Sequence, residues 1–120
     1  MQLEELKQMF LSKNSTTEDF PFGEDVMVFK VMGKMFGLIS LNDTPFNVNL
    51  KCDPQDAIAY REIYKSVNPG YHMNKKHWNT ITIDGSIEKT ILQEMIDDSY
   101  TLVVKKLTKK QKEELNFKSL

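Results

Sequence analysis

The chain has 120 residues, of which 40% are hydrophobic and 28% are charged, and its formal net charge is −1. These values exclude collagen-like, low-complexity and disordered proteins and predict a single domain with one core. No apolar run approaches the length of a membrane-spanning helix, and the acidic first residues are unlike a signal peptide, so we expect no membrane partner. The single cysteine, Cys52, excludes an internal disulfide and favours a reducing, cytoplasmic location.

The charges are unevenly distributed. Residues 1–60 carry 5 lysines and 9 acidic residues, whereas residues 61–120 carry 11 basic and 8 acidic residues. A basic second half is a weak indication of an anionic partner. A solvated surface with uneven charge is an equally good interpretation.

The first half of the chain predicts one helix and a hairpin. Residues 2–13 have apolar side chains at helical spacing, and a loop over 14–25 follows. Residues 26–32 and 35–41 are typical of strands. Between them, Gly33–Lys34 predicts a tight turn in which glycine takes a positive φ.

Residues 46–52 predict a third strand, because polar and apolar residues alternate along them. Its outer face would show Asn47, Asn49 and Lys51, either as plain solvent surface or as a binding face. Cys52 falls on the apolar face, which predicts a buried, unreactive thiol.

The next helix begins where Asp53 can cap free backbone N–H groups and Pro54 fits the first helical position. The spacing of apolar residues predicts that Ala57, Ile58 and Ile63 face inward.

The rest of the chain predicts a loop, a strand and a long helix. The loop covers residues 66–77, the strand covers 78–83, and Ser86 is the expected cap of a helix over 87–106. Residues 108–120 form a basic C-terminal helix or tail outside a domain of residues 1–107.

The predicted fold class is α+β. The expected antiparallel sheet consists of a three-strand meander plus a fourth strand, packed against helices. Because strands and helices do not alternate regularly, we do not expect a Rossmann-type nucleotide site.

The densest group of polar and aromatic residues lies at 69–80. Lysines can neutralise phosphates, amides can donate and accept hydrogen bonds, and aromatic rings can stack on bases. The same pattern is consistent with solvated lysines and with a tryptophan packed in the core. The candidate nucleic-acid-binding residues are Tyr71, His72, Asn74, Lys75, Lys76, His77, Trp78 and Asn79.

Other chemistry finds little support in the sequence. His72 and His77 lack a third metal ligand at a fixed spacing, and neither has a recognisable nucleophile as partner. We therefore expect no metal, no cofactor and no enzyme activity. Lysines 105, 106, 109, 110 and 112 suit the end of a helix first and a phosphate-binding stripe second.

Four segments of the chain resemble the MmcQ/YjbR family of small bacterial proteins. The resemblance as a whole runs from about residue 2 to residue 107. The four segments are PGYHMNKKHWNT (69–80), EDFPFG (18–23), VFKVMGKMFGLISL (28–41) and NLKCDP (49–54). The resemblance implies a compact fold similar to bacterial frataxin (CyaY-like) and DNA binding through a double-wing arrangement of hairpins. The frataxin resemblance also raises iron binding, for which frataxins are thought to use an acidic ridge on their first helix and strand. Because this helix offers only Glu4 and Glu5, iron binding is not inferred.

Two functional hypotheses follow for what we expect to be a monomer. The first is a nucleic-acid-binding module that makes mostly non-specific phosphate contacts, with DNA as its partner. The second is a protein- or small-ligand-binding domain with a pocket lined by the same loop. An open convex surface at residues 69–80 would favour the first hypothesis, and a loop folded over a cleft would favour the second.

Overall fold

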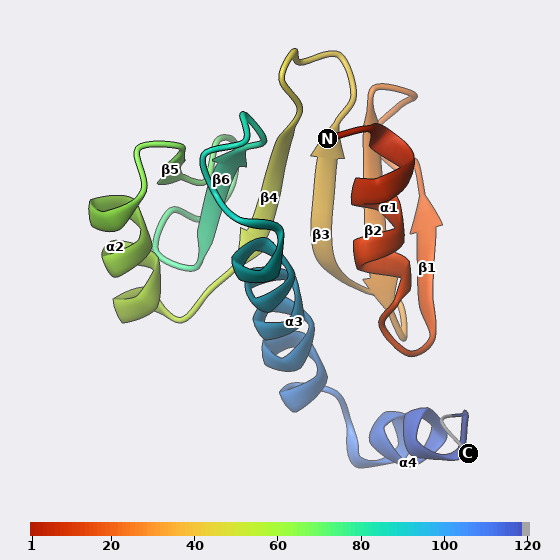
Figure 1. The fold of residues 1–120 in the computed structure, drawn as a ribbon. Helices are drawn as coiled ribbons and strands as arrows, with labels where there is room; N and C mark the ends of the chain where they lie inside the picture. The colour runs from red at the N-terminus through yellow and green to blue at the C-terminus, as the bar shows by residue number, and fades with distance from the viewer. Residues whose placement is uncertain (119–120) are drawn as a thin grey trace.

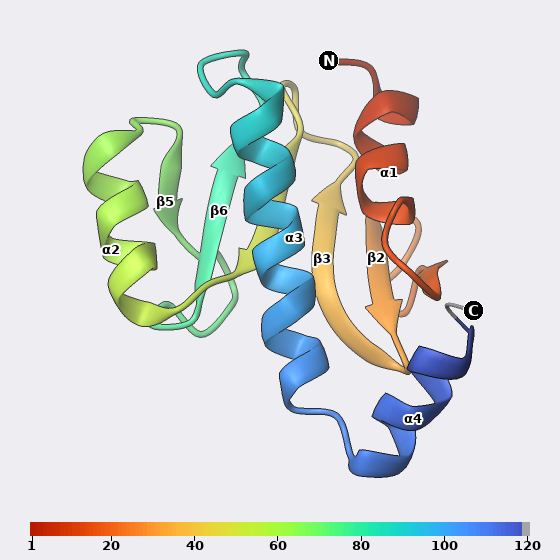
Figure 2. The same cartoon turned by 60° about the horizontal axis from the view of Figure 1, so that its bottom comes forward.

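A computed structural model describes residues 1–118 of the chain. The protein forms one antiparallel sheet with the strand order β1-β2-β3-β4-β6-β5, and helices pack on one of its faces (Figures 1 and 2). The predicted α+β class is confirmed, with six strands in place of the four expected. The elements are α1 (Leu3–Leu11), β1 (Thr16–Asp19), β2 (Val26–Val31), β3 (Lys34–Ser40), β4 (Asn47–Lys51), α2 (Pro54–Ile63), β5 (Val67–Pro69), β6 (Trp78–Thr82), α3 (Lys89–Lys105) and α4 (Lys109–Lys118).

The predicted meander of β2, β3 and β4 is confirmed, and β6 pairs with β4 as its continuation. The turn between β2 and β3 differs from the prediction by one residue, because Val31 pairs with Lys34 and leaves Met32 and Gly33 as the loop. Both loop residues have positive φ, 49° and 78°. This is the pattern of a type I′ turn, whose twist matches that of antiparallel strands.

The sequence pattern does not predict the two edge strands. β1 has four mostly exposed residues, and β5 has only three, one of which is a proline. β1 pairs with β2, and β5 pairs with β6. The pairing of β5 and β6 fixes both ends of the loop that contains the predicted site.

α3 crosses the helix-bearing face of the sheet and contributes most of its buried residues to the main core (Figure 2). α1 lies beside it, and the Gln93 side chain donates a hydrogen bond to the carbonyl of Met9 at 3.1 Å. The predicted cap at Ser86 is wrong: α3 begins at Lys89, and the Ser86 hydroxyl instead bonds to the Asp84 carboxylate at 2.6 Å. Asp84 and Ser86 therefore form a turn of their own, and this turn ends before α3 begins.

α2 packs onto the β5–β6 edge of the sheet. Its predicted start is confirmed, because the Asp53 carboxylate accepts a backbone N–H of the first turn and Pro54 follows. The prediction that Ile58 and Ile63 face inward is wrong, since both are exposed. Ala57 is fully buried instead, because a small side chain allows the helix backbone to come close to β6.

A β-bulge interrupts β3 where its register with β2 shifts by one residue, and Phe36 is the extra residue. The bulge turns the Phe36 ring into the main core beside Gly37. Ser99, fully buried on α3, donates a hydrogen bond to the Phe36 carbonyl at 2.6 Å and accepts one from the backbone N–H of Lys51 at 2.9 Å. One hydroxyl therefore ties α3 to both β3 and β4 at the bulge.

The basic C-terminal segment is a helix, α4, that packs against the domain. Leu115 belongs to the main core, and its carbonyl accepts a hydrogen bond from the Asn14 amide at 3.1 Å. The Tyr100 hydroxyl on α3 bonds to the carbonyl of the same asparagine at 2.8 Å. Residues 119 and 120 of the predicted segment lie outside the described part of the chain. Within residues 1–118, none of the helices has the length and apolar character needed to cross a bilayer.

Candidate ligand groove on the open face of the sheet

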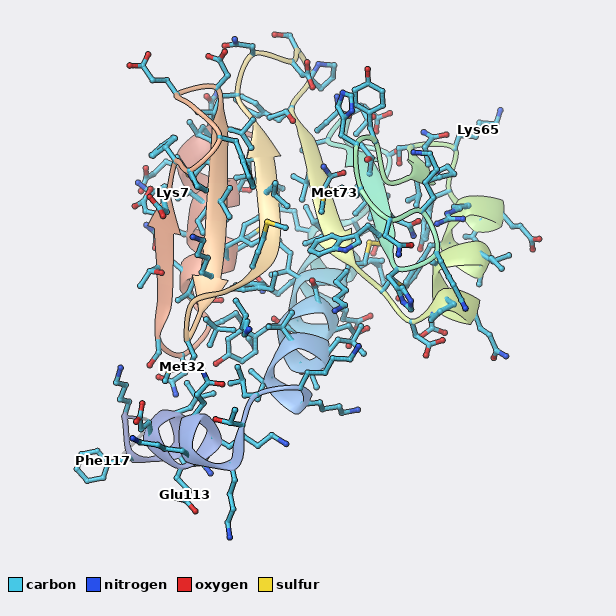
Figure 3. All side chains as sticks on the ribbon, turned by 180° about the vertical axis from the view of Figure 1, so that it is seen from behind. Lys7, Met32, Lys65, Met73, Glu113 and Phe117 are labelled. Atoms are coloured by element: carbon cyan, nitrogen blue, oxygen red, sulfur yellow. The ribbon has the colours of Figure 1, made fainter. Side chains whose placement is uncertain are left out.

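The face of the sheet opposite α3 carries a groove of about 730 Å³. Figure 3 shows this face, with Met73 lying over it and α1 and α3 on the far side of the sheet. The volume is in the range of small-molecule sites, roughly 300–1,000 Å³. Strands β2 to β6 supply the floor, and the segments before β2 and after β5 supply the walls.

The floor of the groove is polar where β4 and β6 pair. Asn47 lies opposite Thr82 and Asn49 opposite Thr80, so each amide meets a hydroxyl across the strands. The Thr82 hydroxyl donates to the Asn47 side chain at 2.7 Å, and the Thr80 hydroxyl bonds to the Asn49 side chain in the same way. Asn47 in turn donates to the Asp43 carboxylate at 2.8 Å. Of the three residues predicted on this face, Asn47 and Asn49 belong to an ordered row of polar groups in the groove. Lys51 does not line the groove and instead lines a separate hollow with Val103 and Lys106.

Several polar groups of the floor keep hydrogen-bonding capacity. Within residues 1–118, the Asn49 amide nitrogen, the Asn68 side chain and the Ser40 hydroxyl make no hydrogen bond to protein atoms. Asn68 lies next to Thr80 in the sheet register, so its amide adjoins the same row. A ligand in the groove would therefore find donors and acceptors that the fold does not use.

Exposed aromatic side chains border the groove. Phe22 is 65% exposed and Tyr71 is 69% exposed, although both line the hollow. The His72 ring lies against Tyr71, with ring centroids 4.0 Å apart, and its backbone has a positive φ of 59°. Large aromatic groups left in solvent at a concave surface are typical of binding sites.

An arginine of α2 holds the loop that forms one wall. Arg61 Nε donates to the Asn79 side chain at 2.6 Å, and Nη2 donates to the Lys75 carbonyl. The Asn79 amide donates on to the carbonyl of Ala57 at 3.3 Å. Because a guanidinium presents several donors in a fixed plane, one side chain can fix α2, β6 and the loop together.

The sequence predicted eight candidate residues in this region. In the structure, some of them line the groove and the others do not. Tyr71 and His72 line the groove. Lys75 is exposed, but its ammonium is used within the loop, where it donates to the Gly70 carbonyl at 3.1 Å. Lys76 is exposed, and within the described residues its ammonium makes no ion pair or hydrogen bond.

The other four residues build the loop. The Asn74 side chain accepts the backbone N–H of Lys76 at 2.9 Å, and the His77 carbonyl accepts the N–H of Cys52 at 2.7 Å. Trp78 is only 9% exposed and packs with a small apolar cluster, which confirms the core-packing interpretation of its ring. Asn79 is 3% exposed and faces the helices. The loop therefore folds back on itself beside the groove.

Sequence reasoning missed Arg61, Phe22 and Asn68. A signal for Arg61 exists in its spacing, since it follows the buried Ala57 by four residues and so lies on the same side of α2. Phe22 lies in the EDFPFG segment, but no pattern in the sequence marks it or Asn68 as part of a groove, because both come from segments that acquire their place only when the sheet forms.

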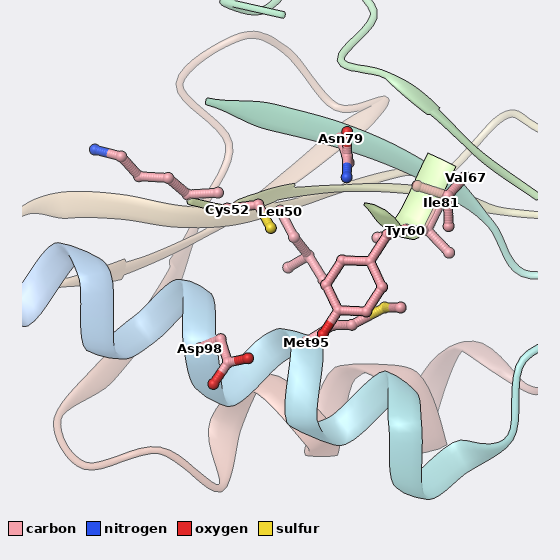
Figure 4. A pocket seen from close by; sticks show the side chains of 9 residues that line it. Leu50, Cys52, Tyr60, Val67, Asn79, Ile81, Met95 and Asp98 are labelled. Carbon is pink, nitrogen blue, oxygen red and sulfur yellow. The ribbon is translucent and has the colours of Figure 1, made fainter. Parts of the chain in front are cut away.

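A second hollow lies between the sheet, α2 and α3 (Figure 4). Its volume is about 20 Å³, and Tyr60, Cys52 and Asp98 are among the side chains around it. This is room for a single water molecule at most. In the described part of the chain, no cluster of three His, Cys, Asp or Glu side chains is suited to a metal ion. Of these two hollows, the groove is the one with room for a small-molecule ligand.

Cys52 should be an unreactive thiol at neutral pH. Burial raises the pKa of Cys52 from 9.0 to about 11, and the nearby carboxylates of Asp56, Asp53 and Asp98 add to the effect. The thiolate is the reactive form, so at pH 8 we expect iodoacetamide to alkylate the folded protein about 100-fold more slowly than the unfolded protein in urea. The measurement is the alkylation rate as a function of pH. A rate that reaches its plateau below pH 9 would contradict the expectation.

Comparison with known proteins gives a consistent result. A model of the YjbR family matches residues 11–102. The uncharacterized protein YbdF of Escherichia coli O157:H7 is 47% identical over 92 residues, covering 76% of this chain and 75% of that protein. The uncharacterized protein YjbR of Escherichia coli K12 is 27% identical over 112 residues, covering 93% and 95%.

Solved structures show the same fold. The crystal structure of protein DR2400 from Deinococcus radiodurans has a TM-score of 0.88 and 37% sequence identity, covering 95% of this chain and 87% of that one. A crystal structure from Pseudomonas syringae has a TM-score of 0.73 and 25% identity, covering 85% and 98%. The sequence motifs, the family match and these neighbours agree, and the chain belongs to the MmcQ/YjbR family.

Proposed function

We propose that this protein is a binding module whose ligand lies in the groove on the open face of the sheet. The observation that carries the proposal is the combination of polar floor groups that keep hydrogen-bonding capacity, such as the amides of Asn49 and Asn68, with exposed aromatic rings at the rim. The single free thiol, Cys52, is consistent with the reducing cytoplasm in which we place this activity. A monomer suffices for binding, because all the groups named come from one chain.

The lining indicates the class of ligand. Among the groove residues, Asp43 carries the only formal charge apart from the titratable His72, and no lysine or arginine lines the hollow. A polyphosphate would find no cation there, whereas hydroxyl, amide and ring groups would all find partners. The ligand we propose is therefore a neutral polar molecule with a ring, such as a nucleoside or a sugar.

The test is saturation-transfer NMR with a panel of nucleosides and monosaccharides, followed by titration of any ligand found. Tyr71→Ala and Asn49→Ala should each weaken binding by about tenfold, because the first removes a stacking surface and the second removes an amide from the floor. Phe117→Ala and Gln55→Ala are matched controls, since they remove an exposed aromatic ring and an exposed amide outside the groove. The proposal fails if no member of the panel binds, or if the controls weaken binding equally.

DNA binding is the second candidate. It is supported by the exposed, unpaired ammonium of Lys76, in the same loop as Tyr71 and His72 and in the segment that carries the family resemblance. Fluorescence anisotropy with duplex and single-stranded oligonucleotides tests it. If about three cations contact phosphates, affinity should fall about 40-fold between 50 and 200 mM salt.

Lys76→Glu is the informative variant for the DNA candidate, because the Lys75 ammonium is already used inside the loop. Lys65→Glu is its control, since Lys65 is also exposed and lies outside the loop. Equal DNA affinity in both variants would reject this candidate without affecting the groove.

A further inference from the structure

The strongest unassigned feature is a group of three lysines at the end of the sheet where α3 finishes. Lys34 begins β3, Lys51 ends β4, and Lys106 follows the last residue of α3. Together with Met35 and Val103 they line a hollow of about 260 Å³. Three of the five lining side chains are therefore cations, contributed by three different elements.

The three ammonium groups lack anionic partners. The ion pairs within the described residues involve Lys7, Lys13, Lys30 and Lys89, and none of the three lysines of the hollow. Nor does any of the three side chains donate a hydrogen bond to another described residue. Burial, and then the charge of Lys106, lower the pKa of Lys51, as expected when like charges converge without compensation.

In the described part of the chain, no carboxylate lines this hollow or forms an ion pair with its lysines, although Asp98 lies with Lys51 around the small hollow of Figure 4. Asp53, Asp56 and Asp98 line an adjoining hollow with Lys105, and their charges act on Cys52. The carbonyls at the end of α3 would repel an anion if they were free. Two of them accept backbone N–H groups of Lys106 and Leu107, at 3.1 Å each, which reduces that repulsion.

The backbone under the lysines is fixed. Ser99 bonds to the Lys51 N–H and to the carbonyl of Phe36, two residues after Lys34. The same serine lies on α3, seven residues before Lys106. A fully buried hydrogen-bonded link thus holds the three elements together, so the backbone positions that carry the three lysines are fixed before an anion arrives.

We propose that Lys34, Lys51 and Lys106 form a binding site for a phosphate or phosphate monoester. A dianion would compensate most of the converging charge, and three ammonium groups can each donate to a different oxygen of a tetrahedral anion. This site is separate from the groove and does not depend on the function proposed above.

The experiment is an amide-detected NMR titration of the whole chain with inorganic phosphate at pH 7, with chloride keeping the ionic strength constant. Saturable shifts should centre on residues 34, 51 and 106, with a dissociation constant on the order of 1 mM. Glycerol phosphate, a monoester, should bind similarly. Dimethyl phosphate, a monoanionic diester, should bind at least about tenfold more weakly, since it carries half the charge.

Variants give the decisive comparison. Lys51→Met with Lys106→Met keeps much of each apolar stem and should weaken phosphate binding at least about tenfold. Lys109→Met with Lys112→Met removes the same charge from α4 and should leave it within about twofold. Shifts that never saturate, equal losses in both double variants, or equal binding of the diester would overturn the proposal. Asn49→Ala should not change phosphate affinity, which separates this test from that of the groove.

Discussion

Replacing Gly37 with alanine should destabilise the protein by about 3 kcal/mol, at the upper end of the range for overpacked cores. A Cβ at this position would overlap Cε1 of the Phe10 ring and lie 2.9 Å from its Cδ1. The ring cannot move aside, because it is fully buried and stacked on Phe29 with centroids 4.3 Å apart. Without the overlap, alanine would stabilise a strand by about 0.5–1 kcal/mol relative to glycine. A loss of stability in Gly37→Ala would therefore indicate the steric overlap, and a gain would argue against it.

Urea unfolding measures this prediction, and a double-mutant cycle supplies the control. In a Phe10→Ala background the obstructing ring is absent, so Gly37→Ala should cost less than about 1 kcal/mol. The coupling between the two sites should then exceed about 2 kcal/mol. Equal costs of Gly37→Ala in both backgrounds would show that the ring is not the cause.

Replacing Arg61 with methionine should cost about 3 kcal/mol of stability and abolish ligand binding in the groove. The change removes the hydrogen bonds to Asn79 and to the Lys75 carbonyl, and it leaves a buried amide oxygen without its donor. Such an unsatisfied group costs about 1–3 kcal/mol, and the loss of the second bond adds to this. The groove is affected because Tyr71 and His72 belong to the loop that the arginine holds.

Urea unfolding and hydrogen exchange at residues 75–78 test the Arg61 prediction. Lys65→Met is the matched control, since it removes a positive charge just after the same helix and should change stability by less than about 0.5 kcal/mol. Arg61→Lys should recover only part of the loss, because one ammonium cannot reproduce the geometry of the guanidinium. Unchanged exchange in the loop of Arg61→Met would contradict the role assigned to the arginine.

Helices and strands whose own sequence is strongly periodic could be predicted. Strands that form only by pairing with an adjacent strand could not. β4 is found from its alternation and α2 from its Asp53–Pro54 start. β1 and β5 become strands only because β2 and β6 offer hydrogen-bonding edges, and a proline in β5 argues against a strand in isolation. The spacing of apolar residues wrongly predicted a buried Ile58. Because α2 packs closely against the edge of the sheet, the small side chain of Ala57 is buried instead.

The candidate site shows the same division. The polar row of Asn47 and Asn49 could be predicted because alternation in one strand determines which side chains share a face. The groove could not, since it also needs Phe22, Asn68 and Tyr71 from three other segments. The role of Trp78 was decided by a cluster with Val28 and Leu38, which are distant in sequence.

The outer strand β1 has a consequence for behaviour at high concentration. It is the terminal strand on its side, and its four residues end in Glu18 and Asp19. Both carboxylates are committed to lysines of the same molecule, Lys7 and Lys30. A second molecule that docked its own β1 alongside would have to accommodate these charged side chains on a strand of only four residues. A short edge strand with charged side chains disfavours edge-to-edge pairing, so this edge of the sheet is protected against growth into fibrils or open-ended assemblies.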